Sequence, residues 1–377
     1  MDAWVRAQAA HIVARFERDL AALVAVSSPS GDVVGFEECV RIAAALAPEE
    51  ASVERRQCSS PEHAPDLVLR MRGSGRRRVL LLGHLDTVHQ HDHHRPLSRV
   101  GDRMLGSGSV DMKGGDVLAV AILRALAGRR EDFAEVALLL VGDEEWRTAP
   151  FVHVERFAGW DACLCFEAGQ LADGEEAVVV KRKGAGTMRV EAFGRAAHSG
   201  SAPERGANAL LALGSAALAV AGRHDPAGPD RVTAVPTVIR SGDAFNVVPD
   251  AGELLCDVRA DRLDAIEAVA DVVPGEVDGV RLETELLRRW PPMDSRETAA
   301  GLLARAAEAA GRRIVASGRG GASDASHFAP AIALTVDGLG PRGAAAHSSG
   351  EHVLVESLKP RAEIALAMTL AALDTEL

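Results

Sequence analysis

The chain has 377 residues, of which 47% are hydrophobic and 25% charged, so it is long enough for two globular domains and too apolar for a disordered protein. Its 42 basic and 54 acidic residues give a formal net charge of −12. This charge argues against nucleic acid as a main partner, because phosphate binding needs a basic surface. The sequence has no uncharged apolar run of about 18 residues, so we expect no membrane span.

Two further features bear on the compartment. The N-terminal residues Met1-Asp2-Ala3-Trp4 lack the basic and then apolar pattern of a signal peptide. The five cysteines are odd in number and include no Cys-x-x-Cys pair, which favours free thiols in a reducing compartment. We therefore expect a cytoplasmic protein.

The first part of the chain has the pattern of an α/β fold. Apolar side chains at helical spacing predict an amphipathic helix over residues 4–26. Short apolar runs predict buried strands, with helical segments between them, at 66–71, 79–82, 136–141 and 161–166. One of these helical segments is 115–126. Strands that alternate with helices indicate a sheet that is covered on both faces.

The pattern changes from about Lys183. The predicted order is then strand, helix, strand, strand, helix, strand, at 187–193, 206–221, 233–241, 253–260, 263–272 and 280–286. This βαββαβ order is typical of a ferredoxin-like α+β domain. Helices and an apolar strand at 331–336 return after Pro291-Pro292. We therefore predict an α/β domain of residues 1–182 and 293–377 that is interrupted by an inserted domain of residues 183–292.

Acidic and imidazole side chains follow several predicted strands. They are His84 and Asp86 after the strand at 79–82, Glu144 and Glu145 after 136–141, Glu167 after 161–166, and His347 beyond 331–336. Asp111 precedes Gly114-Gly115 and a helix. Because ligands of open α/β sheets gather beyond the carboxyl ends of the strands, these side chains are expected to converge. Carboxylates that lie so close together repel one another, and a divalent cation would relieve this repulsion. Imidazole and carboxylate ligands favour Zn²⁺, with Co²⁺ and Mn²⁺ as alternatives.

Short motifs in a fixed order carry a family resemblance. They are Gly-His-Leu-Asp-Thr-Val at 83–88, Gly-Ser-Val-Asp-Met-Lys-Gly-Gly at 108–115, Asp-Glu-Glu at 143–145, Ala-His-Ser-Gly at 197–200, Asn-Val-Val-Pro at 246–249, Asp-Val-Arg at 257–259, Ala-Ser-Asp-Ala at 322–325 and His-Ser-Ser-Gly-Glu at 347–351. Together they resemble the dizinc metallohydrolase family of acetylornithine deacetylase, succinyl-diaminopimelate desuccinylase, aminoacylase and glutamate carboxypeptidase. The spacing is most similar to the glutamate carboxypeptidase branch. The resemblance implies a zinc-peptidase-like catalytic domain with a mixed sheet, and an inserted lid through which the chain forms a homodimer.

The resemblance also implies the metal ligands. Asp111 would bridge two divalent ions, His84 and Glu167 would complete one site, and Glu145 and His347 would complete the other. A cis peptide bond is implied after Asp111, where it would aim the bridging carboxylate.

Further roles follow from the same resemblance. Asp86 would fix the tautomer of His84, and Glu144 would be the general base that takes a proton from water and later gives it to the leaving amine. In the inserted domain, three residues would contact the substrate: His198 at the developing oxyanion, and Arg259 and Asn246 at the carboxylate and backbone.

The implied reaction is metal-dependent hydrolysis of an amide bond, which releases an amino acid, with glutamate as one candidate, from an N-acyl amino acid or a short peptide. A carboxypeptidase and an N-acyl-amino-acid deacylase both remain open. Two other classes are disfavoured. A non-catalytic binding homologue would not need the intact Glu144 and ligand set, and a serine hydrolase would need a Gly-x-Ser-x-Gly turn between a strand and a helix, which we do not find.

Two features depart from the family pattern or stand outside it. The branch commonly has small residues after the paired glutamates, whereas this chain has Trp146-Arg147. The histidines 89, 91, 93 and 94 form a dense group past the strand at 79–82, and we interpret this group as a solvated loop.

Overall fold

The computed structural model describes residues 1–374, and the chain divides into two compact units. The first unit contains Met1–Lys181, Asp294–Gly318 and the segment that begins at Ser323. The second unit contains Arg182–Met293 and the short segment Arg319–Ala322. The first unit is therefore interrupted twice, once by a long insertion and once by a four-residue loop.

A six-stranded mixed sheet forms the centre of the first unit. Its order is β1 (Ser52–Arg56), β2 (Asp66–Arg72), β6 (Glu135–Val141), β3 (Arg78–His84), β7 (Ala162–Cys165) and β19 (Leu334–Val336). The pairs from β6 to β19 are parallel, and β1 and β2 add two antiparallel pairs. Nearly every residue of β3, β6 and β7 is buried, as expected for strands covered on both faces.

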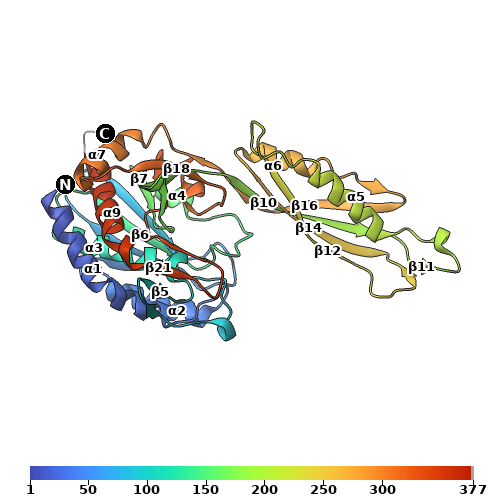
Figure 1. Ribbon diagram of the computed structural model, residues 1–377, viewed down its shortest axis with the longest axis horizontal. Coiled ribbons are helices and arrows are strands. Elements are labelled where there is room, and N and C mark those ends of the chain that lie inside the picture. Colours follow the sequence, from blue (N-terminus) through green and yellow to red (C-terminus); the bar gives the residue numbers. More distant parts are fainter. Residues whose placement is uncertain (375–377) are drawn as a thin grey trace. The chain divides into compact units, whose positions relative to one another are not determined.

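Helices cover this sheet. They are α1 (Ala3–Val24), α2 (Val33–Leu46), α3 (Gly114–Leu126), α4 (Val154–Phe157), α7 (Ala300–Ala310), α8 (Ala325–Phe328) and α9 (Leu358–Leu373). The helices α3 and α9 pack on β3, and α1 packs on both of them, so that the three lie together beside the sheet (Figure 1). The carboxylate of Asp2 begins α1 by accepting hydrogen bonds from the amides of Trp4 and Val5.

Two smaller sheets complete the first unit. One has the order β20 (Gly343–Ala344), β21 (His352–Leu354), β5 (Arg103–Leu105) and β4 (Ser98–Val100). The other has the order β17 (Met293–Asp294), β9 (Glu175–Arg182) and β18 (Val315–Arg319), with β8 (Gln170–Ala172) paired to β9. The first of these sheets joins the segment just after residue 97 to the segment around His347.

The second unit is an antiparallel sheet with two helices on one face (Figure 1). The sheet order is β12 (Thr233–Ser241), β14 (Ala251–Ala260), β10 (Gly184–Phe193), β16 (Val280–Trp290) and β15 (Glu276–Val277). The helices are α5 (Ala209–Ala221) and α6 (Leu263–Ala270), and a small ladder pairs β11 (Ala197–His198) with β13 (Val247–Val248). Alternating buried positions along β10 and β14 face α5 and α6 and form the core of this unit.

The predicted fold class is confirmed: an α/β domain with a mixed sheet and an α+β domain of βαββαβ order. Two predicted elements begin three residues later than expected. The strand predicted at 331–336 begins at Leu334, because the amides of Ala331 and Ile332 bind the carbonyl of Phe328 in a turn. The helix predicted at 206–221 begins at Ala209, because Asn208 caps it.

All five cysteines are buried, and none forms a disulfide among the described residues. Within residues 1–374, no helix combines the length and the apolar character that crossing a bilayer requires.

Candidate metal centre

The parallel strands deliver the predicted ligands to one edge of the first sheet. Strands β6, β3 and β7 are neighbours that run in the same direction, so their carboxyl ends lie side by side. His84 ends β3, Glu145 lies in the loop after β6, and Glu167 follows β7. Asp111 precedes α3, and His347 follows β20.

Three of these side chains form a first ligand group. His84 Nε2 lies 3.3 Å from Asp111 Oδ1 and 3.8 Å from Glu167 Oε1. One ligand atom from each residue lies within 4.8 Å of the others, which is close enough for the three to share a cation.

A second group uses the other oxygen of the same aspartate. His347 Nε2 lies 3.1 Å from Asp111 Oδ2 and 3.3 Å from Glu145 Oε2, and these ligand atoms also lie within 4.8 Å of one another. Asp111 therefore presents one carboxylate oxygen to each imidazole. The peptide bond that follows it, Asp111–Met112, is cis, as the family resemblance implied.

The donor set fits two divalent cations. Both groups consist of one imidazole nitrogen and two carboxylates, the ligands that Zn²⁺ and related ions accept. Within the described residues, the buried atoms His84 Nε2 and Glu145 Oε1 have no hydrogen-bond partner of good geometry. Buried polar atoms are seldom left in this state, and a cation bound at the first group would satisfy His84 Nε2.

Two residues of the site, His347 and Glu144, have raised pKa values. Hydrogen bonds to Asp111 and Glu145 raise the pKa of His347 to about 10. Burial, followed by the neighbouring acids Asp324, Glu167 and Glu145, raises the pKa of Glu144 well above its usual range.

A cation would have to displace the proton of His347, so affinity for the cation is expected to rise with pH up to about 10.

Asp86 supports both the first ligand and the loop of the predicted base. Its main-chain oxygen lies 3.0 Å from His84 Nδ1, and its Oδ1 lies 3.3 Å from the same nitrogen. Its two carboxylate oxygens also accept hydrogen bonds of 3.2 Å from the amides of Glu144 and Glu145. The proton of His84 thus sits on Nδ1, and Nε2 faces the other ligands.

Glu351 is a site residue to which the sequence analysis gave no role. It is buried, and its oxygens accept hydrogen bonds from the amides of Gly108, Val110 and Asp111 at 2.9, 2.9 and 3.0 Å. It therefore holds the loop that presents the shared aspartate. The signal was its place at the end of the motif at 347–351.

The interpretation of the histidine group as a solvated loop does not hold for all four members. His94 is half-buried and its Nε2 is buried, and the interpretation is wrong for His89. His91 and His93 are exposed, but His89 is largely buried and its Nε2 lies 2.8 Å from Glu351 Oε2. His89 thus adds an imidazole contact to the carboxylate oxygen that also accepts the hydrogen bond from the Gly108 amide.

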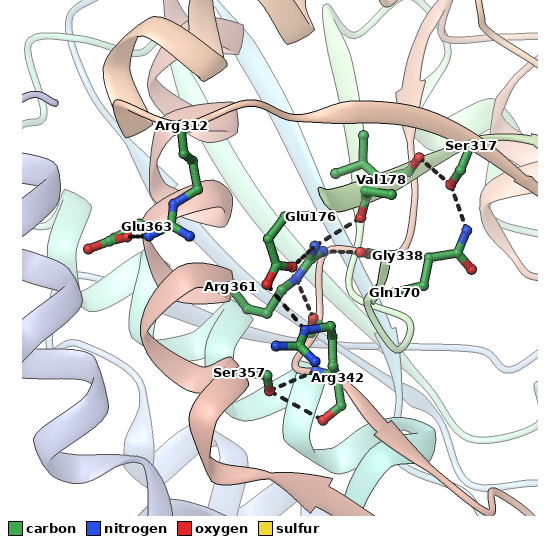
Figure 2. A network of polar contacts seen from close by, with 12 residues as sticks. Gln170, Glu176, Val178, Arg312, Ser317, Gly338, Arg342, Ser357, Arg361 and Glu363 are labelled. Carbon is green, nitrogen blue, oxygen red and sulfur yellow. Dashed lines mark hydrogen bonds and ion pairs between the residues drawn. The ribbon is translucent and has the colours of Figure 1, made fainter. Parts of the chain in front are cut away.

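A second support lies under Glu167. The amide of Gly340 donates to the carbonyl of Glu167 at 2.8 Å, and a Cβ on Gly340 would lie 2.4 Å from the carbonyl of Phe166, so no larger residue fits there. The buried Arg361 binds the carbonyls of Gly338 and Gly340 and the carboxylate of Glu176 (Figure 2).

The three predicted substrate residues lie in the second unit. His198 Nδ1 accepts hydrogen bonds from the amides of Gly200 and Ser201 at 3.1 Å, so the neutral ring carries its proton on Nε2. Asn246 is exposed, and its main-chain carbonyl accepts a hydrogen bond from the backbone amide of Ser199, the residue after His198. Arg259 donates to Asp257 at 2.9 Å and to the carbonyl of Gly320 at 3.3 Å.

An α/β sheet with two ligand groups that share one carboxylate, together with an inserted α+β domain, defines the class of two-metal peptidases and amidohydrolases. Comparison with known proteins agrees. The chain belongs to peptidase family M20/M25/M40, whose family model matches residues 80–371. The family predicted from the motifs is thus confirmed, and with it a metal-dependent hydrolase of amide bonds.

Three relatives illustrate the match. The chain is 26% identical to carboxypeptidase G2 of Pseudomonas sp. (strain RS-16), over 94% of this chain and 89% of that protein. It is 30% identical to succinyl-diaminopimelate desuccinylase of Methylobacterium nodulans, over 76% of this chain and 79% of that protein. Among solved structures, a dinuclear metal binding peptidase from Bacillus subtilis superposes with a TM-score of 0.70 at 14% identity, covering 97% and 99% of the two chains.

Proposed function

We propose that this protein is a dizinc hydrolase of the carboxypeptidase type, which releases a C-terminal amino acid from a short peptide or an N-acyl amino acid. The observation that carries this proposal is the geometry of Asp111, which presents one oxygen to each of two imidazoles. A single-metal enzyme would not need this arrangement. When bound, two cations would lower the pKa of a water and polarise the scissile carbonyl.

The residues of the chain would then divide the remaining work. Glu144 is the general base, because its carboxylate is mostly buried, is not needed by either ligand group and has a pKa that burial raises above its usual range. Asp86 keeps Glu144 in place, because the Asp86 carboxylate accepts a hydrogen bond from the backbone amide of Glu144. The proton that Glu144 takes from the attacking water returns to the leaving amine.

The substrate would be recognised from the second unit. His198, with its proton on Nε2, can donate to a developing oxyanion, and Arg259 can offer a planar pair of donors to a carboxylate. Asn246 is exposed and can contact the substrate backbone.

The match to carboxypeptidase G2 over almost the whole chain favours a carboxypeptidase. The 30% identity to a desuccinylase keeps an N-acyl-amino-acid deacylase as the second candidate.

Reconstitution tests this proposal. The metal-free protein is expected to be inactive towards a panel of dipeptides and N-acyl amino acids, and to gain at least about 100-fold in rate when it is loaded with Zn²⁺, Co²⁺ or Mn²⁺ at two ions per chain. The best substrate distinguishes the carboxypeptidase from the deacylase. Two bound ions without turnover of any panel member would contradict the hydrolase, and failure to bind metal would contradict the site.

We also propose a homodimer that forms through the second unit. On α5 the side chains of Leu211 and Leu218 are 68% and 77% exposed, and the edge strand β12 exposes Val235 and Ile239. Apolar side chains beside an unpaired strand edge are typical of an interface.

Leu218→Glu is therefore expected to convert a dimer to a monomer in sedimentation experiments, because a carboxylate would be buried without a partner. Leu171→Glu, at an exposed leucine of the first unit, is the matched control and should leave the dimer intact. A wild-type monomer would refute the dimer.

We also propose a cytoplasmic location, as expected from the sequence. The buried cysteines without disulfides support a reducing compartment.

A further inference from the structure

Arg147 is one of the largest fully buried side chains among the described residues, although it carries a permanent charge. It lies at the position where the resemblance leads one to expect a small residue. Its neighbour Trp146 is 62% exposed, so the chain turns the aromatic ring outwards and the guanidinium inwards. Burying a guanidinium is costly unless carboxylates surround it, so its partners define what it does.

Two buried aspartates bind this guanidinium. One nitrogen donates to Asp143 Oδ1 at 2.7 Å, and the other donates to Asp324 Oδ1. The first nitrogen also lies 3.4 Å from Asp324 Oδ2, and the ring of Phe151 lies 4.4 Å from the guanidinium carbon. The planar fork of Arg147 thus joins two carboxylates. Asp143 lies four residues from Arg147 in the sequence, whereas Asp324 lies 177 residues from it.

These contacts fix both ends of the loop that carries the proposed base. Glu144 and Glu145 lie between Asp143 and Arg147 in the chain, and Asp143 is itself held by the amide and hydroxyl of Ser60 at 2.9 and 2.8 Å. The middle of the loop is held by Asp86 through the amides of Glu144 and Glu145. The anchors Asp143, Asp86 and Arg147 are buried, and Arg147 connects the loop to Asp324.

We propose that Arg147 is a positioning residue of the hydrolytic reaction: it binds Asp143 and Asp324 together and so fixes the directions of the Glu144 and Glu145 side chains. The inference rests on the proposed function for the role of Glu144, but the geometry of Glu145 as a ligand can be tested without turnover. The departure from small residues at this place is then explained, because the arginine supplies the connection to Asp324 that a small side chain cannot make.

Three variants test this inference. Arg147→Met keeps much of the volume and removes both hydrogen-bonded contacts, Arg147→Lys keeps the charge but lacks the planar fork, and Asp324→Asn removes only one partner's charge. Arg124→Met is the matched control. Arg124 lies in the last turn of α3, pairs with the buried Asp19 and touches no proposed site residue. For each variant we would measure kcat, KM, the visible spectrum of the Co²⁺-loaded protein and the melting temperature.

The expected result for Arg147→Met is a loss of about 100-fold in kcat with KM within about twofold, because a small misplacement of the base costs turnover rather than binding. The Co²⁺ spectrum should change as well, since Glu145 is a proposed ligand. Arg147→Lys should fall between this variant and the wild type. Arg124→Met should lower the melting temperature and leave kcat and the spectrum unchanged.

Other outcomes overturn the inference. If Arg147→Met is folded with wild-type kcat and an unchanged Co²⁺ spectrum, Arg147 is a structural ion pair only. An equal loss of kcat in Arg124→Met would lead to the same conclusion. If Arg147→Met does not fold, Asp324→Asn decides through its spectrum and kcat. If the wild type binds Co²⁺ but hydrolyses no substrate, the proposed function fails, and the spectra still decide the role of Arg147.

Discussion

Glu144→Gln is expected to reduce kcat by at least about 10³-fold while both metal ions remain bound. The amide has nearly the same shape as the carboxylate, but it cannot accept the proton of the attacking water. Glu144 belongs to neither ligand group, so the ligand atoms of His84, Asp111, Glu145, Glu167 and His347 are all retained. Steady-state kinetics and the metal content of the purified variant together check this result.

The neighbouring residue provides the contrast. Glu145→Gln removes a ligand of the second group, whose Oε2 lies 3.3 Å from His347 Nε2, so this variant should lose one of two ions. Two variants at adjacent positions are thus expected to separate proton transfer from metal binding. A Glu144→Gln protein with wild-type kcat, or with only one ion, would show that the base lies elsewhere.

Glu351→Gln is expected to weaken metal binding by about 10- to 100-fold, although Glu351 touches no cation in our proposal. Its two oxygens accept from the amides of Gly108, Val110 and Asp111, and the nitrogen of His89 lies against the second oxygen. A glutamine side chain replaces one acceptor with an NH₂ donor, which would face an N–H donor of the loop. The loop would then present Asp111 less accurately. Competition with a chelator measures the affinity of each ion.

The control for this variant is Glu356→Gln. Glu356 is largely exposed and lies 3.4 Å from Arg342, so neutralising it should leave metal affinity unchanged. Because Asp111 is shared, the Glu351 variant should weaken both ions rather than one. An effect on one ion only would mean that Glu351 supports something other than the shared carboxylate.

Much of the fold follows from local sequence patterns. The strands β2, β3 and β6 are largely apolar runs that begin with a charged residue, and the strands and helices of the second unit show the amphipathic alternation that their half-buried positions require. The proposed ligands could be found because the carboxyl ends of parallel strands place side chains at one edge, and because ordered motifs resemble a known family. In both cases the information lies within a few residues of the side chain.

The supporting residues could not be found in this way. Glu351 and His89 contact each other across 262 residues, and Arg147 and Asp324 across 177. A buried charge is tolerated only through such a partner, and neither member of the pair reveals the other by its neighbours in the chain. The histidine group was misjudged for this reason, because its polar surroundings in sequence said nothing about Glu351.

The order of the ligands along the chain has a consequence for biosynthesis. The ligands of the first group, and the inner strands that carry two of them, are all synthesised by residue 167, whereas His347 follows roughly 180 residues later, after the whole insertion. At translation rates of about 5–20 residues per second, this separates the two groups by roughly 10–40 s. A nascent chain can therefore hold the ligands for one ion long before it can hold two. The second ion, and hence activity, would arrive only when the C-terminal segment has returned to the first unit.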